Sequence, residues 1–476
     1  MHRGNYINGE FRESATQGTV LNPATGSVAG HVPLAGATEA LEAVEAAAAA
    51  QRAWARLPAI ERGNALRRFA AEIEARADAI GAALALESGK SLADARGEAI
   101  YGAELMRYHA EWARRIEGEI IPSDNPGETL LLRREAIGVV ACLIPFNYPV
   151  YTLVRKIAPA LISGNTVVAR PSNSTPLSAL VLAGAADAAG MPPGTVNILA
   201  MSHEVAERVC RHRAVGMITL TGSLAAGRKV LDYARENIAR PSLELGGKTP
   251  VIVAPDADLD AAAAGIIAAK TTHCGQLCTA PERVYAHADI HDALLERLRA
   301  GFAARRFGDR SQDASLMGPL ATRAAQMEVH ARVQRALTEG AKLEAGGTLP
   351  DGPGFFYPPT LLSGCRQEMD IVAEEVFGPV LPVLSYQSEA EALALANDHQ
   401  FGLSSVLLTR DHGMIMRFSE RIEAGELYVN RFPADPYQGF HAGWKRSGLG
   451  GDDGKHGMLT FTQTRLVVIK HQEDPR

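Results

Sequence analysis

Two of the five cysteines in the 476-residue chain, Cys274 and Cys278, lie four residues apart after an alanine-rich segment. A deprotonated thiol is a strong nucleophile, so a cysteine in this setting is a candidate for covalent catalysis. Two other interpretations stay open on these residues alone: both thiols pack as small apolar side chains, or the pair forms half of a metal site. Residues in other segments are needed to choose among these three interpretations.

Two further segments carry groups that suit the same chemistry. Asn147 lies between Pro145 and Pro149, and its side-chain amide can donate to an oxyanion that develops during a reaction. Glu244 lies beside apolar residues and a Gly-Gly pair, where burial would raise its pKa toward that of a general base. The alternatives are a rigid packing loop for the first segment and a solvated carboxylate for the second.

The segment 217–227 predicts a strand that runs into a helix through Thr221, Gly222 and Ser223. Free backbone N–H groups at a helix start bind anions, so a phosphate fits there, although the segment lacks the G-x-G-x-x-G dinucleotide pattern. A simple turn is the alternative. No H-E-x-x-H or Cys-x2-Cys pattern occurs in the sequence, so no metal site is predicted.

Composition limits the classes of partner. The net charge of −6 and the isoelectric point near 6.2 leave no basic field, so neither a nucleic acid nor a membrane is an expected partner. An odd number of irregularly spaced cysteines favours a reducing compartment, and we expect the protein in the cytoplasm. The N-terminal residues turn polar at once, which does not suit a secretion signal, and no apolar run approaches the length of a membrane span.

The order of the predicted elements indicates two α/β regions after a helical layer. Helical patterns cover 38–56, 60–88 and 91–117, and a β-ribbon is predicted over 119–134. Strands then alternate with helices from residue 138 to about 245 and again to about 451, which favours parallel sheets. The last predicted strand, 462–470, has too little chain after it to be covered within the subunit, so we expect it to pair with the ribbon of another subunit.

These segments occur in the order and spacing of the NAD(P)-dependent aldehyde dehydrogenase superfamily, which essentially the whole chain resembles. The motifs that carry this resemblance are 145–149, 164–168, 221–223, 244–248, 275–278 and 375–379. Within the superfamily, the bacterial lactaldehyde and glycolaldehyde dehydrogenases resemble this chain most over 111–121, 438–451 and 453–457.

The resemblance implies an α/β fold with two Rossmann-like, parallel-sheet domains and a β-ribbon for oligomerisation. Residues 1–118 and 138–245 are expected to form the cofactor-binding domain and 246–455 the catalytic domain. Residues 119–137 and 456–476 are expected to form the oligomerisation ribbon and tail. A homodimer or homotetramer is implied.

Catalytic roles follow from the same resemblance. It implies that Cys278 is the nucleophile and that Asn147 and the Cys278 backbone N–H are the oxyanion donors. Glu244 is implied as the base that activates the hydrolytic water, and Lys156 helps to shape the site, while Cys274 has no chemical role. The thiolate would add to an aldehyde, hydride would leave for the cofactor, and water would cleave the resulting thioester.

The implied cofactor is NAD. In family terms Ser223 contacts the pyrophosphate, Glu375 the nicotinamide ribose and Phe377 the nicotinamide. The family commonly has Lys-Pro-x-Glu at the adenosine ribose, where this chain has Arg170-Pro-Ser-Asn173; because this change removes a carboxylate and offers an arginine, NADP or dual use stays open. The cofactor residues implied are Ile144, Pro145, Phe146, Arg170, Ser172, Asn173, Thr221, Gly222, Ser223, Gly246, Glu375 and Phe377.

For the substrate, the resemblance implies a small aldehyde, with Arg155, Tyr148 and His441 facing it. In the lactaldehyde group Arg155 and His441 would hydrogen-bond the hydroxyl of a 2-hydroxyaldehyde. One alternative is a semialdehyde dehydrogenase, in which Arg155 would bind the distal carboxylate. Another is a catalytically silent scaffold. An enzyme that forms acyl-CoA is less expected, because Glu244 remains to activate water.

Overall fold

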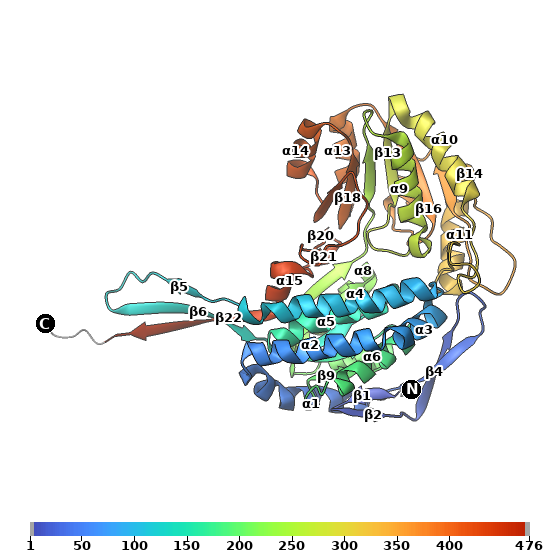
Figure 1. The fold of residues 1–476 in the computed structure, drawn as a ribbon. Coiled ribbons are helices and arrows are strands. Elements are labelled where there is room, and N and C mark those ends of the chain that lie inside the picture. The colour runs from blue at the N-terminus through green and yellow to red at the C-terminus, as the bar shows by residue number, and fades with distance from the viewer. Residues whose placement is uncertain (1–3, 472–476) are drawn as a thin grey trace.

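The chain folds into two α/β lobes, and a long β-ribbon projects from the lobe that contains the N-terminus (Figure 1). The computed structural model describes residues 4–471. Residues 1–3 of the predicted cofactor domain and 472–476 of the predicted tail lie outside the described residues. In the part of the chain described, no helix is long and apolar enough to cross a membrane.

The first lobe is built on an eight-stranded sheet in the order β2-β1-β9-β8-β7-β10-β11-β21. Five central strands are parallel, and they are rich in buried β-branched residues, as strands covered on both faces must be. Antiparallel strands at both edges make the sheet mixed. The strands are β1 (Asn5–Ile7), β2 (Glu10–Arg12), β7 (Val139–Leu143), β8 (Thr166–Arg170), β9 (Val196–Ile198), β10 (Val215–Gly222), β11 (Arg240–Leu245) and β21 (Gly448–Leu449).

Helices cover this sheet, and α5 is buried along its whole length. Pro149 starts α5, which suits the first helical turn because the missing N–H has no intrahelical partner there. The helices of the first lobe are α1 (Ala37–Arg56), α2 (Ala59–Ala75), α3 (Ala77–Ser88), α4 (Leu92–Ala110), α5 (Pro149–Ile162), α6 (Leu177–Ala188), α7 (His203–Cys210), α8 (Leu224–Asn237) and α15 (Gly454–Thr460). The predicted helix 91–117 ends earlier, at Ala110, and continues as a short 3-10 turn over Glu111–Arg114.

The second lobe contains a seven-stranded sheet in the order β14-β15-β16-β13-β12-β18-β19. It is parallel apart from the edge strand β14. Its strands are β12 (Pro250–Val253), β13 (Arg283–His287), β14 (Lys342–Ala345), β15 (Thr360–Ser363), β16 (Val380–Tyr386), β18 (Ser404–Leu408) and β19 (Glu426–Val429). Its helices are α9 (Leu259–Thr271), α10 (Ala288–Ala304), α11 (Arg323–Thr338), α12 (Asp370–Ala373), α13 (Glu389–Asn397) and α14 (His412–Arg421).

Two small antiparallel pairs complete the fold. They are β3 (Thr16–Leu21) with β4 (Val28–Leu34), and β17 (Phe401–Gly402) with β20 (Trp444–Lys445). Because β21 follows β20 and pairs with β11, residues of the expected catalytic domain contribute an edge strand to the first sheet. The chain therefore crosses back between the lobes at 444–449.

The ribbon is a three-stranded sheet of β5 (Glu119–Ile121), β6 (Glu128–Ala136) and β22 (Thr462–Lys470). The expected pairing of the last strand with another subunit is wrong, because β22 pairs with β6 of its own chain from Thr462↔Ala136 to Lys470↔Glu128. Buried Met458 and Phe461 hold α15 at the foot of the ribbon, so the chain leaves α15 already alongside β6. The two strands lie side by side in Figure 1.

Candidate active site

Two cavities meet at Cys278, one of about 440 Å³ and one of about 660 Å³. The four residues that line both are Asn147, Thr221, Glu244 and Cys278. The smaller cavity extends along the ends of β7 and β10 toward α8, and the larger one extends toward α4, α5 and the loop after α10. A molecule in either cavity can therefore approach the Cys278 sulfur.

An unusual backbone turn separates the two cysteines. His273, Cys274 and Gly275 all have positive φ, at 45°, 58° and 71°. Left-handed conformations cost non-glycine residues free energy and persist where the surroundings enforce them, often at functional sites. Gly275 is required here, because a Cβ on it would lie 2.4 Å from the Gly378 carbonyl oxygen. The turn leaves Cys274 fully buried and places Cys278 on the walls of both cavities.

Asn147 lies in the loop between β7 and α5. Its Nδ2 donates to the Gln276 carbonyl at 2.9 Å, which fixes the amide beside the Cys278 loop. Lys90 and Glu98 hold the loop from behind: Lys90 Nζ lies 2.7 Å from the Asn147 carbonyl oxygen and 2.5 Å from Glu98, and Glu98 accepts from the backbone N–H of Val150. The amide is thereby oriented before any substrate arrives, as an oxyanion donor must be.

Glu244 is the penultimate residue of β11 and is buried, with its Oε1 3.4 Å from Nε2 of His441. The expectation that burial raises its pKa is wrong. Burial alone would raise the pKa of Glu244, but His441, Arg155 and Lys156 together outweigh it and lower the pKa. The carboxylate is therefore ionised and can accept a proton.

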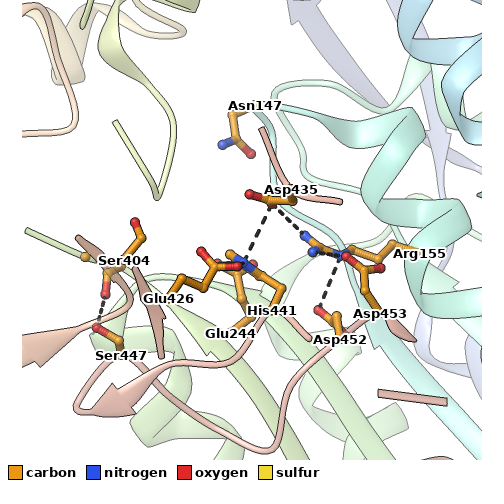
Figure 2. A network of polar contacts seen from close by, with 12 residues as sticks. Asn147, Arg155, Glu244, Ser404, Glu426, Asp435, His441, Ser447, Asp452 and Asp453 are labelled. Atoms are coloured by element: carbon orange, nitrogen blue, oxygen red, sulfur yellow. Dashed lines mark hydrogen bonds and ion pairs between the residues drawn. The ribbon is translucent and has the colours of Figure 1, made fainter. Parts of the chain in front are cut away.

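His441 is buried among three carboxylates. Its Nδ1 lies 2.9 Å from Glu426 and 3.7 Å from Asp435, and its Nε2 faces Glu244 (Figure 2). Burial lowers the pKa of His441, but the surrounding carboxylates, Asp435 first, raise it well above the ordinary value, so the ring is an imidazolium. His441 is not among the residues that line either cavity; it lies behind Glu244 and Cys278.

Ligand-type atoms of Glu244, Cys278 and His441 all lie within 4.8 Å of one another, a spacing that could hold a metal ion. The sequence gives no sign of this cluster because its members come from β11, the loop after α9 and the chain beyond β19.

Arg155 lies on α5 in a charged environment. Arg155 and Tyr148 line the larger cavity, and Arg155 lies near three carboxylates: it pairs with Asp453, and its nitrogens are 3.5 Å from Asp435 and 4.0 Å from Asp452. Asp435 lies between His441 and Arg155 in Figure 2. The cavity wall near Cys278 is therefore polar and charged.

Lys156 lines neither cavity. Its side chain is fully buried, and its ammonium is 2.6 Å from Asp452. It acts on the site through charge and packing, since it contributes to the lowered pKa of Glu244.

The smaller cavity collects eleven of the twelve implied cofactor residues: Ile144, Pro145, Phe146, Arg170, Ser172, Thr221, Gly222, Ser223, Gly246, Glu375 and Phe377. The twelfth, Asn173, does not line it but accepts a hydrogen bond from Arg170 Nη2 at 2.9 Å. Ser223 caps α8 by accepting from the Ala226 N–H, so the positive end of the helix dipole opens into the cavity.

Glu375 lies against the Gly246–Gly247 turn and accepts from the Gly247 N–H at 3.0 Å. A Cβ on Gly246 would lie 2.2 Å from the Glu375 carboxylate, so this close approach requires glycine. Burial and the neighbouring Glu282 raise the pKa of Glu375 to about 8. Phe377, in the same loop, meets Phe146 of the first lobe edge to face, with the ring centroids 5.9 Å apart.

A buried ion-pair triad supports these loops. Glu282 lies 2.8 Å from Lys248 and 2.7 Å from Lys270, and it also accepts from the Val376 N–H at 3.0 Å. It thereby joins the Gly-Gly-Lys turn, α9 before the Cys278 loop and the loop that carries Glu375. No sequence motif singled out this residue.

A model of the aldehyde dehydrogenase family matches residues 11–467. The chain belongs to the aldehyde dehydrogenase family. Lactaldehyde dehydrogenase of Escherichia coli (strain K12) is 42% identical over 98% of both chains, and its crystal structure superposes with a TM-score of 0.96. Glutarate-semialdehyde dehydrogenase of Pseudomonas putida is 36% identical over 98% of this chain and 97% of its own. Betaine aldehyde dehydrogenase of Staphylococcus aureus, solved with NAD+, is 30% identical with a TM-score of 0.97, covering 100% and 98% of the two chains.

Membership of the family makes this chain an NAD(P)-dependent aldehyde dehydrogenase. The smaller cavity suits a nicotinamide dinucleotide: it contains a helix start for phosphates, a carboxylate on a glycine turn for a ribose, and the unpartnered buried hydroxyl of Thr221 beside Cys278. When bound, the cofactor accepts hydride. The smaller cavity is hereafter the cofactor cavity and the larger one the substrate cavity.

Eight lining residues of the cofactor cavity were not predicted, among them His203, Lys229 and Tyr233. Ala226, Lys229, Val230 and Tyr233 recur at helical spacing on one face of α8, and this periodicity could have revealed them. Burial, then Arg170, lowers the pKa of His203, and Lys229 adds to this effect. Three basic side chains therefore gather in one part of the cofactor cavity.

Proposed function

We propose that this enzyme oxidises a small 2-hydroxyaldehyde, such as lactaldehyde or glycolaldehyde, to the carboxylate with NAD(P). The observation that carries the proposal is the polar wall beside Cys278, where Arg155 and Asp435 line the substrate cavity and His441 lies directly behind Glu244. A hydroxyl next to the aldehyde finds donors and acceptors there. The similarity to lactaldehyde dehydrogenase supports the same substrate class.

The reaction begins with the thiol of Cys278. Burial, and then the Glu244 charge, raise the pKa of Cys278, so the thiol keeps its proton until a base removes it. The Glu244 carboxylate has an oxygen within 4.8 Å of the sulfur and is ionised, so it can take this proton directly or through a water. The thiolate then adds to the aldehyde carbon.

Addition converts the carbonyl oxygen into an oxyanion. The Asn147 amide and the Cys278 backbone N–H are the donors that would stabilise it. Asn147 Nδ2 uses one hydrogen on the Gln276 carbonyl and keeps the second. When the oxyanion collapses and hydride leaves, Cys278 carries a thioester. After Glu244 has released the thiol proton to solvent, its carboxylate removes a proton from the water that cleaves the thioester.

Several finer assignments belong to the same proposal. The first lobe, through α8, binds the dinucleotide, and the second lobe supplies Cys278 and Glu375. The enzyme accepts both NAD and NADP, because Arg170 and Lys229 offer positive charge to a 2′-phosphate and Asn173 replaces a carboxylate that would repel it. The ribbon joins subunits into a dimer or tetramer.

Steady-state kinetics test the proposal. The kcat/KM values for lactaldehyde and glycolaldehyde should exceed those for propanal with either cofactor, and His441→Ala should lower kcat/KM for lactaldehyde more than for propanal. A site that bonds a hydroxyl discriminates against analogues that lack it. Equal losses for both aldehydes in His441→Ala would refute the hydroxyl role.

The two alternatives make different predictions. If the enzyme is a semialdehyde dehydrogenase, succinic semialdehyde will be preferred over lactaldehyde, an outcome that the similarity to glutarate-semialdehyde dehydrogenase keeps in view. If the chain is a catalytically silent scaffold, no aldehyde will reduce either cofactor. The spatial association of Cys278, Asn147 and Glu244 argues against the scaffold.

A further inference from the structure

The substrate cavity extends well beyond the groups that the mechanism uses. Its volume of about 660 Å³ is in the range that holds drug-sized molecules, and a three-carbon aldehyde fills a small part of it. Away from Cys278, its wall includes the loop after α10, which contributes Arg305 and Arg310. The mechanism gives neither residue a role.

Four cationic side chains line this cavity: Lys90, Arg155, Arg305 and Arg310. Three of them are neutralised by carboxylates. Lys90 pairs with Glu98, Arg310 lies 2.5 Å from Asp94, and Arg155 faces Asp435, Asp452 and Asp453. The charge of Arg155 is therefore already neutralised, and Arg155 does not bind a substrate carboxylate.

Arg305 is the exception within the described residues. It is partly buried, its Nε is buried without a hydrogen-bond partner, and it forms no ion pair with any described carboxylate. Burial and then the nearby charge of Arg310 lower the pKa of Arg305, so a neighbouring charge repels it. A guanidinium that is partly desolvated and unpaired is unfavourable, and an anion placed against it would remove that cost.

His273 adds a third group to the same region. Its Nε2 is buried without a partner and its side chain lines the substrate cavity. Burial, then Lys90 and Arg310, lower the pKa of His273 well below the ordinary value, so the ring is neutral and can donate one N–H without adding charge. Guanidinium groups bind carboxylate, sulfonate and phosphate through paired N–H donors.

We propose that Arg305, with Arg310 beside it, forms a subsite for a distal anionic group of the aldehyde substrate. The substrate class is an aldehyde whose carbonyl lies at Cys278 and whose far end carries a carboxylate, sulfonate or phosphate. The inference rests on the proposed function and narrows its substrate. It also assigns the binding of a distal anion to the loop after α10 and not to Arg155.

The test compares aldehydes of equal chain length with and without a terminal charge: succinic semialdehyde with butanal, and glutaric semialdehyde with pentanal. The wild-type enzyme should show a higher kcat/KM for the charged member of at least one pair. Arg305→Met should lower kcat/KM for that charged aldehyde by about tenfold or more and leave its neutral partner and lactaldehyde unchanged, because a charge-assisted contact is lost only where the substrate has a charge.

Arg306→Met is the matched control. Arg306 is adjacent and exposed, pairs with Asp313 and does not line the cavity, so its kinetics should follow the wild type. Thermal unfolding of both variants shows whether either is misfolded. Equal losses for charged and neutral aldehydes in Arg305→Met, no loss for either, or the same selective loss in Arg306→Met would overturn the subsite.

Inhibition by inorganic phosphate shows whether the subsite binds the anionic end of a substrate or a free anion. Phosphate should compete with the charged aldehyde in the wild type and not in Arg305→Met. If phosphate instead alters lactaldehyde oxidation through Arg305 while charged aldehydes gain nothing, the substrate subsite is refuted. Failure to oxidise lactaldehyde or any other aldehyde would refute the proposed function itself, whereas normal lactaldehyde oxidation without preference for a charged aldehyde would refute only the subsite.

Discussion

His441 Nε2 and Glu244 Oε1 lie 3.4 Å apart in the buried centre of the molecule, and both lie close to the Cys278 sulfur. The contact joins the end of β11 in the first lobe to the chain beyond β19 of the second. It keeps the carboxylate ionised despite its burial, which is the state that a proton acceptor needs.

Replacing His441 with glutamine should raise the pKa of Glu244, because burial would no longer be outweighed by the imidazolium. As the pH falls, Glu244 would then become protonated at a higher pH than in the wild type. The acid limb of the kcat profile should shift upward by about one pH unit or more. His330→Gln, in the second lobe, is the control and should leave the profile unchanged. An unshifted acid limb in His441→Gln would separate Glu244 from this contact.

Cys278→Ala should abolish aldehyde oxidation, with a loss on the order of 10³-fold or more, because nucleophilic catalysis has no substitute group in the site. Cys274→Ser should retain most activity, since Cys274 is buried in the core of the second lobe and lines neither cavity. Circular dichroism and thermal unfolding should show both variants folded. Substantial activity in Cys278→Ala, or its loss in folded Cys274→Ser, would reverse the assignment of the two thiols.

Sequence patterns predicted an element of the fold correctly where the residues of that one segment determine its structure. Strands with apolar runs, such as β7 and β10, and the proline-flanked loop at Asn147 could be placed from the sequence. The ionisation of Glu244 could not, because its partner His441 comes from the other lobe. The pairing of β22 was predicted with the wrong chain, since the position of α15 at the foot of the ribbon is a tertiary feature. Arg305 lies in no motif, and only the substrate cavity reveals it.

Lys229→Ala should lower kcat/KM for NADP by about tenfold and leave kcat/KM for NAD nearly unchanged, because only NADP carries the 2′-phosphate. Arg228→Ala provides the matched control: Arg228 is the adjacent exposed cation on α8 and does not line the cofactor cavity. Initial rates over a range of each cofactor give both constants. A loss of equal size for NAD and NADP, or a wild-type enzyme that cannot use NADP at all, would contradict the proposed dual use.

The ribbon register places five apolar side chains on one face: Ile121, Leu130, Leu132, Leu466 and Val468. Leu466 and Val468 are 56% and 54% exposed, an unusual arrangement for an isolated subunit. Replacing both with aspartate should therefore reduce the molar mass in solution, measured by light scattering, toward that of a monomer. Met416→Asp, at an exposed apolar residue on α14, should leave the mass unchanged. An unaltered mass in the double variant would place the subunit interface elsewhere.

The central claim is that the substrate becomes a thioester on Cys278 that Glu244 then helps water to cleave, and Glu244→Gln tests it most directly. Mixed with lactaldehyde and NAD, this variant should release NADH more slowly than the wild type, because no carboxylate takes the thiol proton, and release should stop after about one equivalent per active site, because the thioester is not cleaved. Mass spectrometry of the quenched protein should find the lactoyl group on the peptide that contains Cys278. Steady turnover past one equivalent and no added mass on that peptide would contradict the mechanism.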